Sequence, residues 1–334
     1  MSSSQPSTRK TRAYRGQTLQ PAGYIRRQDN LPFLPEATDL EKYLLEDVQV
    51  SNDHLRSFPN STQLPRSIVG DLNNLEDSVA RIILPAARLA WEVSFEGVAE
   101  AWTESEWRSR CHTPSFLSIT RLDHFSDDIL MRTEASWATL NLREGVSILS
   151  NRPDYSFALR VRTHLQQDDG LLSPALLETL VDDLDPFMET LHEAVFPFAV
   201  VESKSADGSE LQAENQCADS IIKMLYKLRK LGAETSRLPV IAITWIASRP
   251  TIYIAVSRIL FGDTMQWNLQ SLWCGRVTSL SESIQFHIIL YRLLLWARGI
   301  YRPAIMAALQ RRRRQSLQDV TTRPEFMETS NLGK

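Results

Sequence analysis

Residues 196–204 have the sequence FPFAVVESK, a continuous apolar run that ends abruptly in a carboxylate and an ammonium group. Such a run predicts a strand that is buried on both faces. Side chains two residues apart leave the same face of a strand, so Glu202 and Lys204 are expected to lie together. Ser203 points to the opposite face and offers its backbone carbonyl at the end of the strand.

The segments around this strand alternate between helical and extended patterns. The spacing of apolar residues predicts helices from 74 to about 91, from 103 onward, and over 173–194, 210–231 and 281–310, the last with a break near Pro303. Strands are expected within 136–149 and over 154–161, 239–247 and 251–259. This order favours an α/β (α+β) domain with a central mixed sheet flanked by helices.

The two ends of the chain differ in composition from its middle. Residues 1–65 are rich in Ser, Pro, Gln, Asn and Arg, which predicts a largely disordered basic and polar tail with one short helix around 39–48. Residues 66–310 are expected to form a single domain. Residues 311–334 begin with four arginines and predict a second mobile, basic tail.

Charge and hydropathy exclude several classes of protein. The chain has 334 residues, 43% of them hydrophobic, and a net charge of −3, with the basic residues concentrated at the two ends. An acidic body does not coat nucleic acid by charge alone. No apolar stretch is long enough to cross a membrane, and the N-terminus lacks the apolar segment of a secretory signal. We expect an intracellular protein, nuclear or cytoplasmic, and the arginines at 311–314 favour the nucleus.

Common catalytic and cofactor motifs are absent from the sequence. It has no glycine-rich phosphate loop, no dinucleotide-binding GxGxxG, no GxSxG and no HExxH. The three cysteines are far apart and odd in number, which argues against a disulfide framework or a cysteine-based zinc site. Kinase, GTPase, Rossmann and zinc-hydrolase functions therefore lack their residues.

The end of the buried strand is the candidate chemical site. A charged group beside an apolar strand is costly unless it is paired or binds a cation. A hard divalent cation needs more than one carboxylate, and Asp154, at the head of the preceding strand, is the second candidate. Asp154, Glu202 and the Ser203 carbonyl are expected to bind Mg²⁺ or Mn²⁺, with Lys204 beside a metal-bound water. Asp154 also follows Pro153, so the alternative is that it is a turn residue.

The pair Pro153-Asp154 followed by Glu202-Ser203-Lys204 resembles the PD-(D/E)xK nuclease superfamily. The run FPFAVVESKSADGSELQAENQ and the stretch ESEWRSRCHTPSF at 104–116 are similar to the fungal PD-(D/E)xK nuclease-like proteins. The resemblance covers residues 75 to 310. It implies a restriction-endonuclease-like core and metal-dependent hydrolysis of phosphodiester bonds.

The resemblance also implies a role for each residue. Asp154 and Glu202 would hold the metal ion, Lys204 would assist the attacking water, Glu106 would be the supporting acid on the helix, and Gln216 would match the glutamine after the motif. Each helix residue has a simpler alternative. Thr103-x-x-Glu106 is a capping box, and Gln216 is an ordinary helix former. Other acids could also replace Asp154, namely Asp168, Asp169, Asp182, Asp183 and Asp185.

Two functions follow from these residues. The first is a nuclease acting on DNA or RNA. The second is a catalytically silent fold that uses its acidic body to bind a protein partner. Arginines gathered beside Lys204 would favour the nuclease, and arginines scattered over the surface would favour the second function. The candidates are Arg160, Arg162, Arg249 and Arg258.

Overall fold

The computed structural model describes residues 12–28, 31–45, 77–143, 146–161, 194–232, 237–259 and 265–322. Arg162, the five alternative acids between 168 and 185, and all but the last residue of the helix expected over 173–194 lie outside the described residues.

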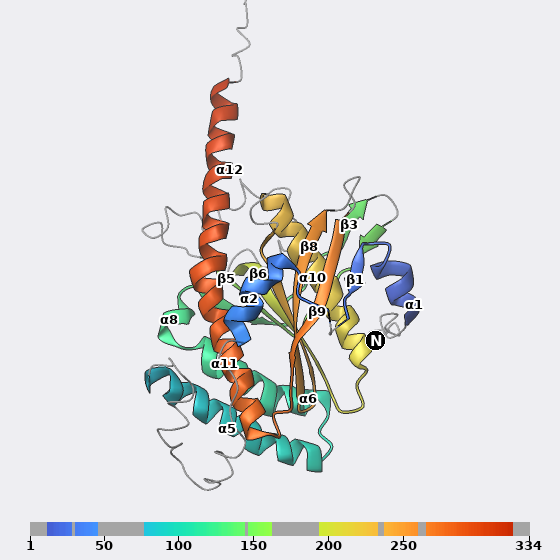
Figure 1. The fold of residues 1–334 in the computed structure, drawn as a ribbon, viewed down its shortest axis with the longest axis vertical. Coiled ribbons are helices and arrows are strands. Elements are labelled where there is room, and N and C mark those ends of the chain that lie inside the picture. The colour runs from blue at the N-terminus through green and yellow to red at the C-terminus, as the bar shows by residue number, and fades with distance from the viewer. Residues whose placement is uncertain are drawn as a thin grey trace, which may run out of the picture.

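A mixed sheet forms the centre of the fold (Figure 1). Its seven described strands lie in the order β1 (Tyr24–Arg26), β9 (Met265–Cys274), β8 (Arg249–Ile259), β7 (Val240–Ile246), β6 (Ala194–Lys204), β5 (Tyr155–Arg160) and β2 (Ile129–Thr133). The pairs β1–β9 and β6–β7 are parallel, and the other pairs are antiparallel. The expected mixed sheet is therefore confirmed.

Strand β6 lies inside the sheet, and all 11 of its residues are buried. It pairs with β5 on one side and with β7 on the other. Pro197 lacks a backbone N–H, and it lies where the pairing with β5 is irregular. The apolar run thus forms the buried strand that the sequence predicts, and it extends without interruption to Lys204.

Helices cover both faces of this sheet. Helix α10 (Glu210–Leu231) connects β6 to β7 and packs on both strands. It ends at Gly232, as expected. On the opposite face, α5 (Asp77–Ala99), α7 (Thr113–Thr120) and α11 (Leu280–Trp296) pack against one another. Phe116 from α7 and Phe286 from α11 both contact Trp245 of β7 edge-on, which joins this helical layer to the sheet.

Shorter elements complete the domain. They are α6 (Glu104–Trp107), the π-helical turn η3 (Arg108–His112), α8 (Asp123–Ser126) and a separate hairpin of β3 (Leu140–Arg143) and β4 (Val146–Ile148). The helix predicted from residue 103 and the strands predicted within 136–149 are therefore present. In the part of the chain that the structure describes, no helix is long and apolar enough to cross a membrane.

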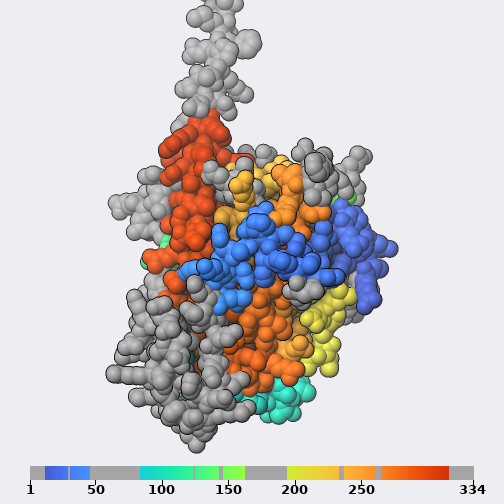
Figure 2. All heavy atoms as spheres, in the orientation of Figure 1, coloured from blue at the N-terminus to red at the C-terminus, as the bar shows by residue number. Residues whose placement is uncertain are grey.

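The N-terminal segment differs from the expected mobile tail. Its described residues form α1 (Arg12–Tyr14), η2 (Arg15–Leu19), β1 and α2 (Pro35–Leu45). Figure 2 shows this segment, in blue, lying across the orange β8–β9 region of the body. Tyr14 donates a hydrogen bond to Asp219 of α10 (2.8 Å), and Trp267 of β9 donates one to the Ala22 carbonyl (2.7 Å). Residues 12–28 and 31–45 are therefore part of the domain.

The C-terminal helix is longer than expected. After α11, the π-helical turn η8 (Ala297–Tyr301) leads into α12 (Arg302–Thr322), whose end extends beyond the sheet in Figure 1. The break in the helix that the sequence predicts near Pro303 corresponds to η8. Pro303 lies just after this π-helical turn, and the altered hydrogen bonding there accommodates a residue without an N–H. The tail predicted from residue 311 is thus helical as far as Thr322.

The docking of β1 gives a stability prediction. Gly23 has a φ of 90°, its carbonyl accepts a hydrogen bond from Trp267 N (2.9 Å), and a Cβ at this position would overlap the Met265 carbonyl oxygen. We expect Gly23→Ala to lower the free energy of unfolding by about 2 kcal/mol. Urea denaturation followed by tryptophan fluorescence measures this change.

Gly16→Ala is the matched control. A Cβ on Gly16 finds its nearest neighbour at 3.9 Å, and alanine is favoured over glycine inside a helical turn. This variant should be at least as stable as the wild type. Equal losses in the two variants would contradict a specific requirement for glycine at position 23.

Candidate active site

The candidate site lies at the carboxyl end of β6. Asp154 directly precedes β5, and the β5–β6 pairing sets Tyr155 opposite Val201, so Asp154 lies beside Glu202 and its neighbours. All three charged side chains are buried: the exposed fractions are 8% for Asp154, 2% for Glu202 and 8% for Lys204. The site is therefore built into the end of the sheet rather than displayed on its surface.

The ammonium group of Lys204 lies among three carboxylates. Its Nζ is 3.6 Å from Glu104 Oε2, 3.9 Å from Glu202 Oε2 and 4.0 Å from Asp154 Oδ2. It also donates a hydrogen bond to the Ser203 carbonyl (2.7 Å). Gly208 packs so closely on Lys204 that a Cβ there would overlap the Lys204 Cβ. The sequence-based expectation that Glu202 and Lys204 share one face is confirmed.

Both oxygens of Asp154 are held. Oδ2 accepts a hydrogen bond from the Ser203 backbone N–H (2.6 Å), and Oδ1 lies 3.2 Å from an Arg108 guanidinium nitrogen. Arg108 also donates to Glu134 (2.9 Å). Burial disfavours the charged guanidinium, but these two carboxylates outweigh it and raise the pKa of Arg108. The orientation of Asp154 is therefore fixed from two sides.

The opposite face of β6 carries a different contact. The Ser203 hydroxyl lies 3.1 Å from His112 Nδ1, and His112 Nε2 lies 2.9 Å from the Ala247 carbonyl. Because a carbonyl only accepts, Nε2 carries the proton and Nδ1 accepts from Ser203. The ring stacks on Trp245 with 4.2 Å between centroids. Complete burial lowers the pKa of His112 to about 3, so this histidine is neutral.

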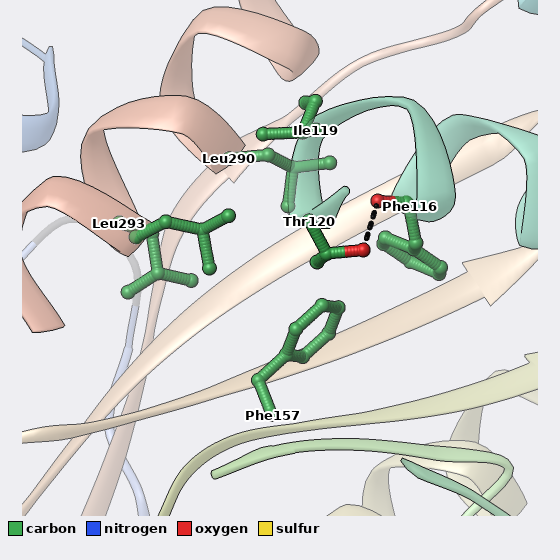
Figure 3. A pocket seen from close by; sticks show the side chains of 7 residues that line it. Phe116, Ile119, Thr120, Phe157, Leu290 and Leu293 are labelled. Carbon is green, nitrogen blue, oxygen red and sulfur yellow. Dashed lines mark hydrogen bonds between the residues drawn. The ribbon is translucent and has the colours of Figure 1, made fainter. Parts of the chain in front are cut away.

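One pocket in the described part of the chain lies between α7, α11 and β5, and it is apolar (Figure 3). Its lining consists of Phe116, Ile119, Thr120, Phe157, Leu290, Leu293 and Leu294. The Thr120 hydroxyl is used internally, since it donates to the Phe116 carbonyl (3.0 Å). A pocket without a charged side chain offers no acid, base or cation ligand, so the chemistry of the candidate site does not use it.

Of the predicted site residues, the structure brings together Asp154, Glu202, Ser203 and Lys204, and it places Glu106 in a helix cap. Glu106 accepts hydrogen bonds from the Thr103 backbone N–H and hydroxyl (both 2.8 Å), which completes a capping box. The Thr103 backbone N–H, together with that hydroxyl, lowers the pKa of Glu106. Gln216 lies on α10, where its Oε1 is buried and has no hydrogen-bond partner among the described residues.

Two residues at the site were missed by the sequence analysis, Glu104 and Arg108. Glu104 occupies the first turn of α6, two residues before Glu106, and it supplies the carboxylate nearest to Lys204 Nζ. The capping box itself was the available signal: a glutamate that caps its own helix is not free to serve a site, which leaves Glu104 as the acid of that turn. Nothing in the sequence pattern distinguishes Arg108.

The oxygens around Lys204 are of the kind that Mg²⁺ and Mn²⁺ prefer, but here they surround its ammonium group. Carboxylate oxygens of Glu104, Glu202 and Asp154 lie 3.6, 3.9 and 4.0 Å from Lys204 Nζ, and the Ser203 carbonyl oxygen lies 2.7 Å from it. Within the described ranges, no three His, Cys, Asp or Glu side chains are drawn together as a metal-ligating group. A bound ion would therefore have to displace the Lys204 ammonium from the centre.

The arginines are divided between the two ends of the sheet. Arg249 is at the same edge as Lys204, because Lys204 pairs with Ile246 and Ile246 pairs with Arg249. Arg258 lies at the far end of β8, where it binds Glu36 (2.9 Å), and Arg160 ends β5. Of the three predicted arginines that the structure describes, one therefore lies at the same end of the sheet as Lys204, two strands away, and Arg108 is the arginine that contacts the site.

Comparison with models of protein families and with curated proteins finds no match for this chain. The resemblance to the PD-(D/E)xK nucleases stays a prediction.

Two buried histidines predict a dependence of stability on pH. Burial lowers the pKa of His112 to about 3 and that of His287 to about 4, from an ordinary value of 6.5. The unfolded chain therefore binds more protons than the folded one below pH 6.5, and stability falls as the pH falls. Each histidine should lower the free energy of unfolding by about 2 kcal/mol as the pH falls from about 7.5 to about 5.

Urea denaturation at the two pH values measures this loss, and His112→Asn tests its source. The variant should lose about 2 kcal/mol less than the wild type over the same interval, whatever its stability at neutral pH. An unchanged pH dependence in His112→Asn would show that the folded state accommodates the protonated ring.

Proposed function

We propose that this protein is a metal-dependent nuclease that hydrolyses phosphodiester bonds of DNA or RNA. The observation that carries the proposal is the position of Lys204 Nζ within 4.0 Å of three carboxylates, which come from α6, the start of β5 and the end of β6. The mixed sheet with helices on both faces is consistent with the restriction-endonuclease-like core that the sequence resemblance implies.

Each residue of the candidate site would have a separate role in this reaction. Asp154, Glu202 and the Ser203 carbonyl would hold Mg²⁺ or Mn²⁺, with Glu104 as the supporting acid on the helix. A bound metal ion would supply a nucleophilic water at neutral pH and would stabilise the charge that develops on the phosphate. Lys204 would lie beside that water, and its ammonium would offset negative charge in the transition state. The Ser203 N–H fixes Asp154 for this purpose.

The alternative is a catalytically silent fold that binds a protein partner. It is favoured by the contacts of Asp154, both of whose oxygens are already engaged by residues of the chain. It is also favoured by the position of Arg258, which is paired with Glu36 at the far end of the sheet. Lys204 and Arg108 already offset part of the negative charge of the carboxylates at the site, as a purely structural role requires.

Cleavage of labelled single- and double-stranded DNA and RNA in Mg²⁺ or Mn²⁺ separates the two functions. We expect cleavage by the wild type and a loss of at least about a hundredfold in Asp154→Ala, Glu202→Ala and Lys204→Ala, because each removes a group that stabilises the transition state. Equal cleavage by wild type and Lys204→Ala would show that a contaminant is responsible. No cleavage of any substrate would favour the silent fold.

Glu104 and Glu106 form a matched pair for the metal site. Glu104→Gln removes a carboxylate that lies 3.6 Å from Lys204 Nζ, whereas Glu106→Gln changes only the capping box. We expect Glu104→Gln to weaken Mn²⁺ binding about tenfold and Glu106→Gln to leave it unchanged, with at most about 1 kcal/mol lost in stability. Titration calorimetry with MnCl₂ measures the affinities. If Glu106→Gln weakened Mn²⁺ binding more than Glu104→Gln, the supporting acid would be Glu106, as the sequence predicts.

A further inference from the structure

A second cation, Arg108, faces the candidate site. It belongs to η3, and its guanidinium group binds two carboxylates at once, Asp154 Oδ1 at 3.2 Å and Glu134 Oε1 at 2.9 Å. The guanidinium carbon also lies 5.7 Å from the centre of the Tyr155 ring. The roles proposed for Lys204 and the other site residues do not account for this second cation on Asp154.

Glu134 is held independently of Arg108. Its φ is 51°, a conformation that residues other than glycine adopt rarely and at an energetic cost. Its N–H donates to the Asp154 carbonyl (3.1 Å), and its own carbonyl accepts from Arg152 Nε (2.8 Å). Its carboxylate also binds Arg152 at 3.0 Å. The backbone conformation thus positions the Glu134 carboxylate that binds one side of the Arg108 guanidinium.

The two carboxylates that bind Arg108, those of Asp154 and Glu134, differ in their surroundings. Asp154 Oδ2 faces Lys204 and Asp154 Oδ1 binds Arg108, so a cation bound beside Oδ2 would share the carboxylate with Arg108 and weaken its hold on the guanidinium. Glu134 is 43% exposed on its side chain and lies outside the group of carboxylates around Lys204. If Asp154 turns to a metal ion, Arg108 keeps its contact with Glu134 and presents its other nitrogens toward the site.

The chemistry of the freed group suits phosphate. A guanidinium is always charged, and its planar donors match two oxygens of a phosphate group. The Arg108 side chain is 22% exposed, so a substrate can reach it. A lysine would offer a point charge without this geometry.

We propose that Arg108 is the phosphate-binding residue of this site and that Glu134 is its positioning residue. In the metal-free protein Arg108 neutralises Asp154. With Asp154 on the metal ion, Arg108 binds a non-bridging oxygen of the phosphodiester that is to be cleaved. This inference rests on the proposed nuclease function and adds to it the residue that recognises the substrate anion.

The test compares Arg108→Gln with Arg110→Gln in the 334-residue chain. Both variants remove one positive charge from η3, but Arg108 binds Asp154 and Glu134, whereas Arg110 binds Glu96 (3.3 Å). Arg108→Gln should bind Mn²⁺ about fivefold more tightly, because a competing cation is gone. It should also cleave the best nucleic-acid substrate of the wild type with a kcat/KM lower by about a hundredfold. Arg110→Gln should change each quantity less than about twofold, because its ion pair with Glu96 is exposed.

The opposite signs of the two effects distinguish this role from a structural one, since a damaged site would lose metal binding and activity together. Arg108→Lys should restore Mn²⁺ affinity to the wild-type value and recover only part of kcat/KM. A wild type that binds Mn²⁺ and cleaves nucleic acid, with an Arg108→Gln variant that binds Mn²⁺ no more tightly or keeps its activity, overturns the role of Arg108 alone. A wild type that binds no Mn²⁺ overturns the proposed function and this inference with it.

Discussion

The hydrogen bond from the Ser203 backbone N–H to Asp154 Oδ2 is the contact on which the candidate site depends. It joins the end of β6 to the residue before β5, and so it ties the positions of Glu202 and Lys204 to that of Asp154. A buried carboxylate is tolerated only when charged or polar donors satisfy it, and here a backbone amide and a guanidinium do so. The remaining charges are arranged around this fixed carboxylate, which makes the geometry of the site a property of the sheet.

Strand alternation lets one short segment serve two environments. Glu202 and Lys204 face the charged group, while Ser203 faces the helical layer and binds a neutral His112 that stacks on Trp245. The histidine accepts from the serine only while it is uncharged, so the packing behind the strand and the charges in front of it are held by one backbone. The His112–Ser203 contact therefore connects the aromatic layer to the strand that carries the charged group.

Sequence patterns located the central part of the fold and failed at its margins. Strand β6 and helix α10 were predicted nearly to the residue, because an uninterrupted apolar run and a helix ending at glycine are strong local signals. The N-terminal segment was missed because its polar, proline-containing composition hides the apolar side chains that it buries, and because it is ordered by partners more than 200 residues away, as in the hydrogen bond of Tyr14 to Asp219. Glu104 was missed because two glutamates share one turn and the resemblance pointed to Glu106, although the capping box already indicated that Glu106 is used by its own helix.

The parallel pairing of β1 with β9 joins residue 24 to residue 267. Because loop closure over such a separation has a high entropic cost, this edge of the sheet is a late contact in folding. During synthesis β1 can pair only after residues 265–274 have been made, whereas the β6–α10–β7 unit that carries the motif assembles from segments close in sequence. The charged site can therefore form before β1 completes the described sheet.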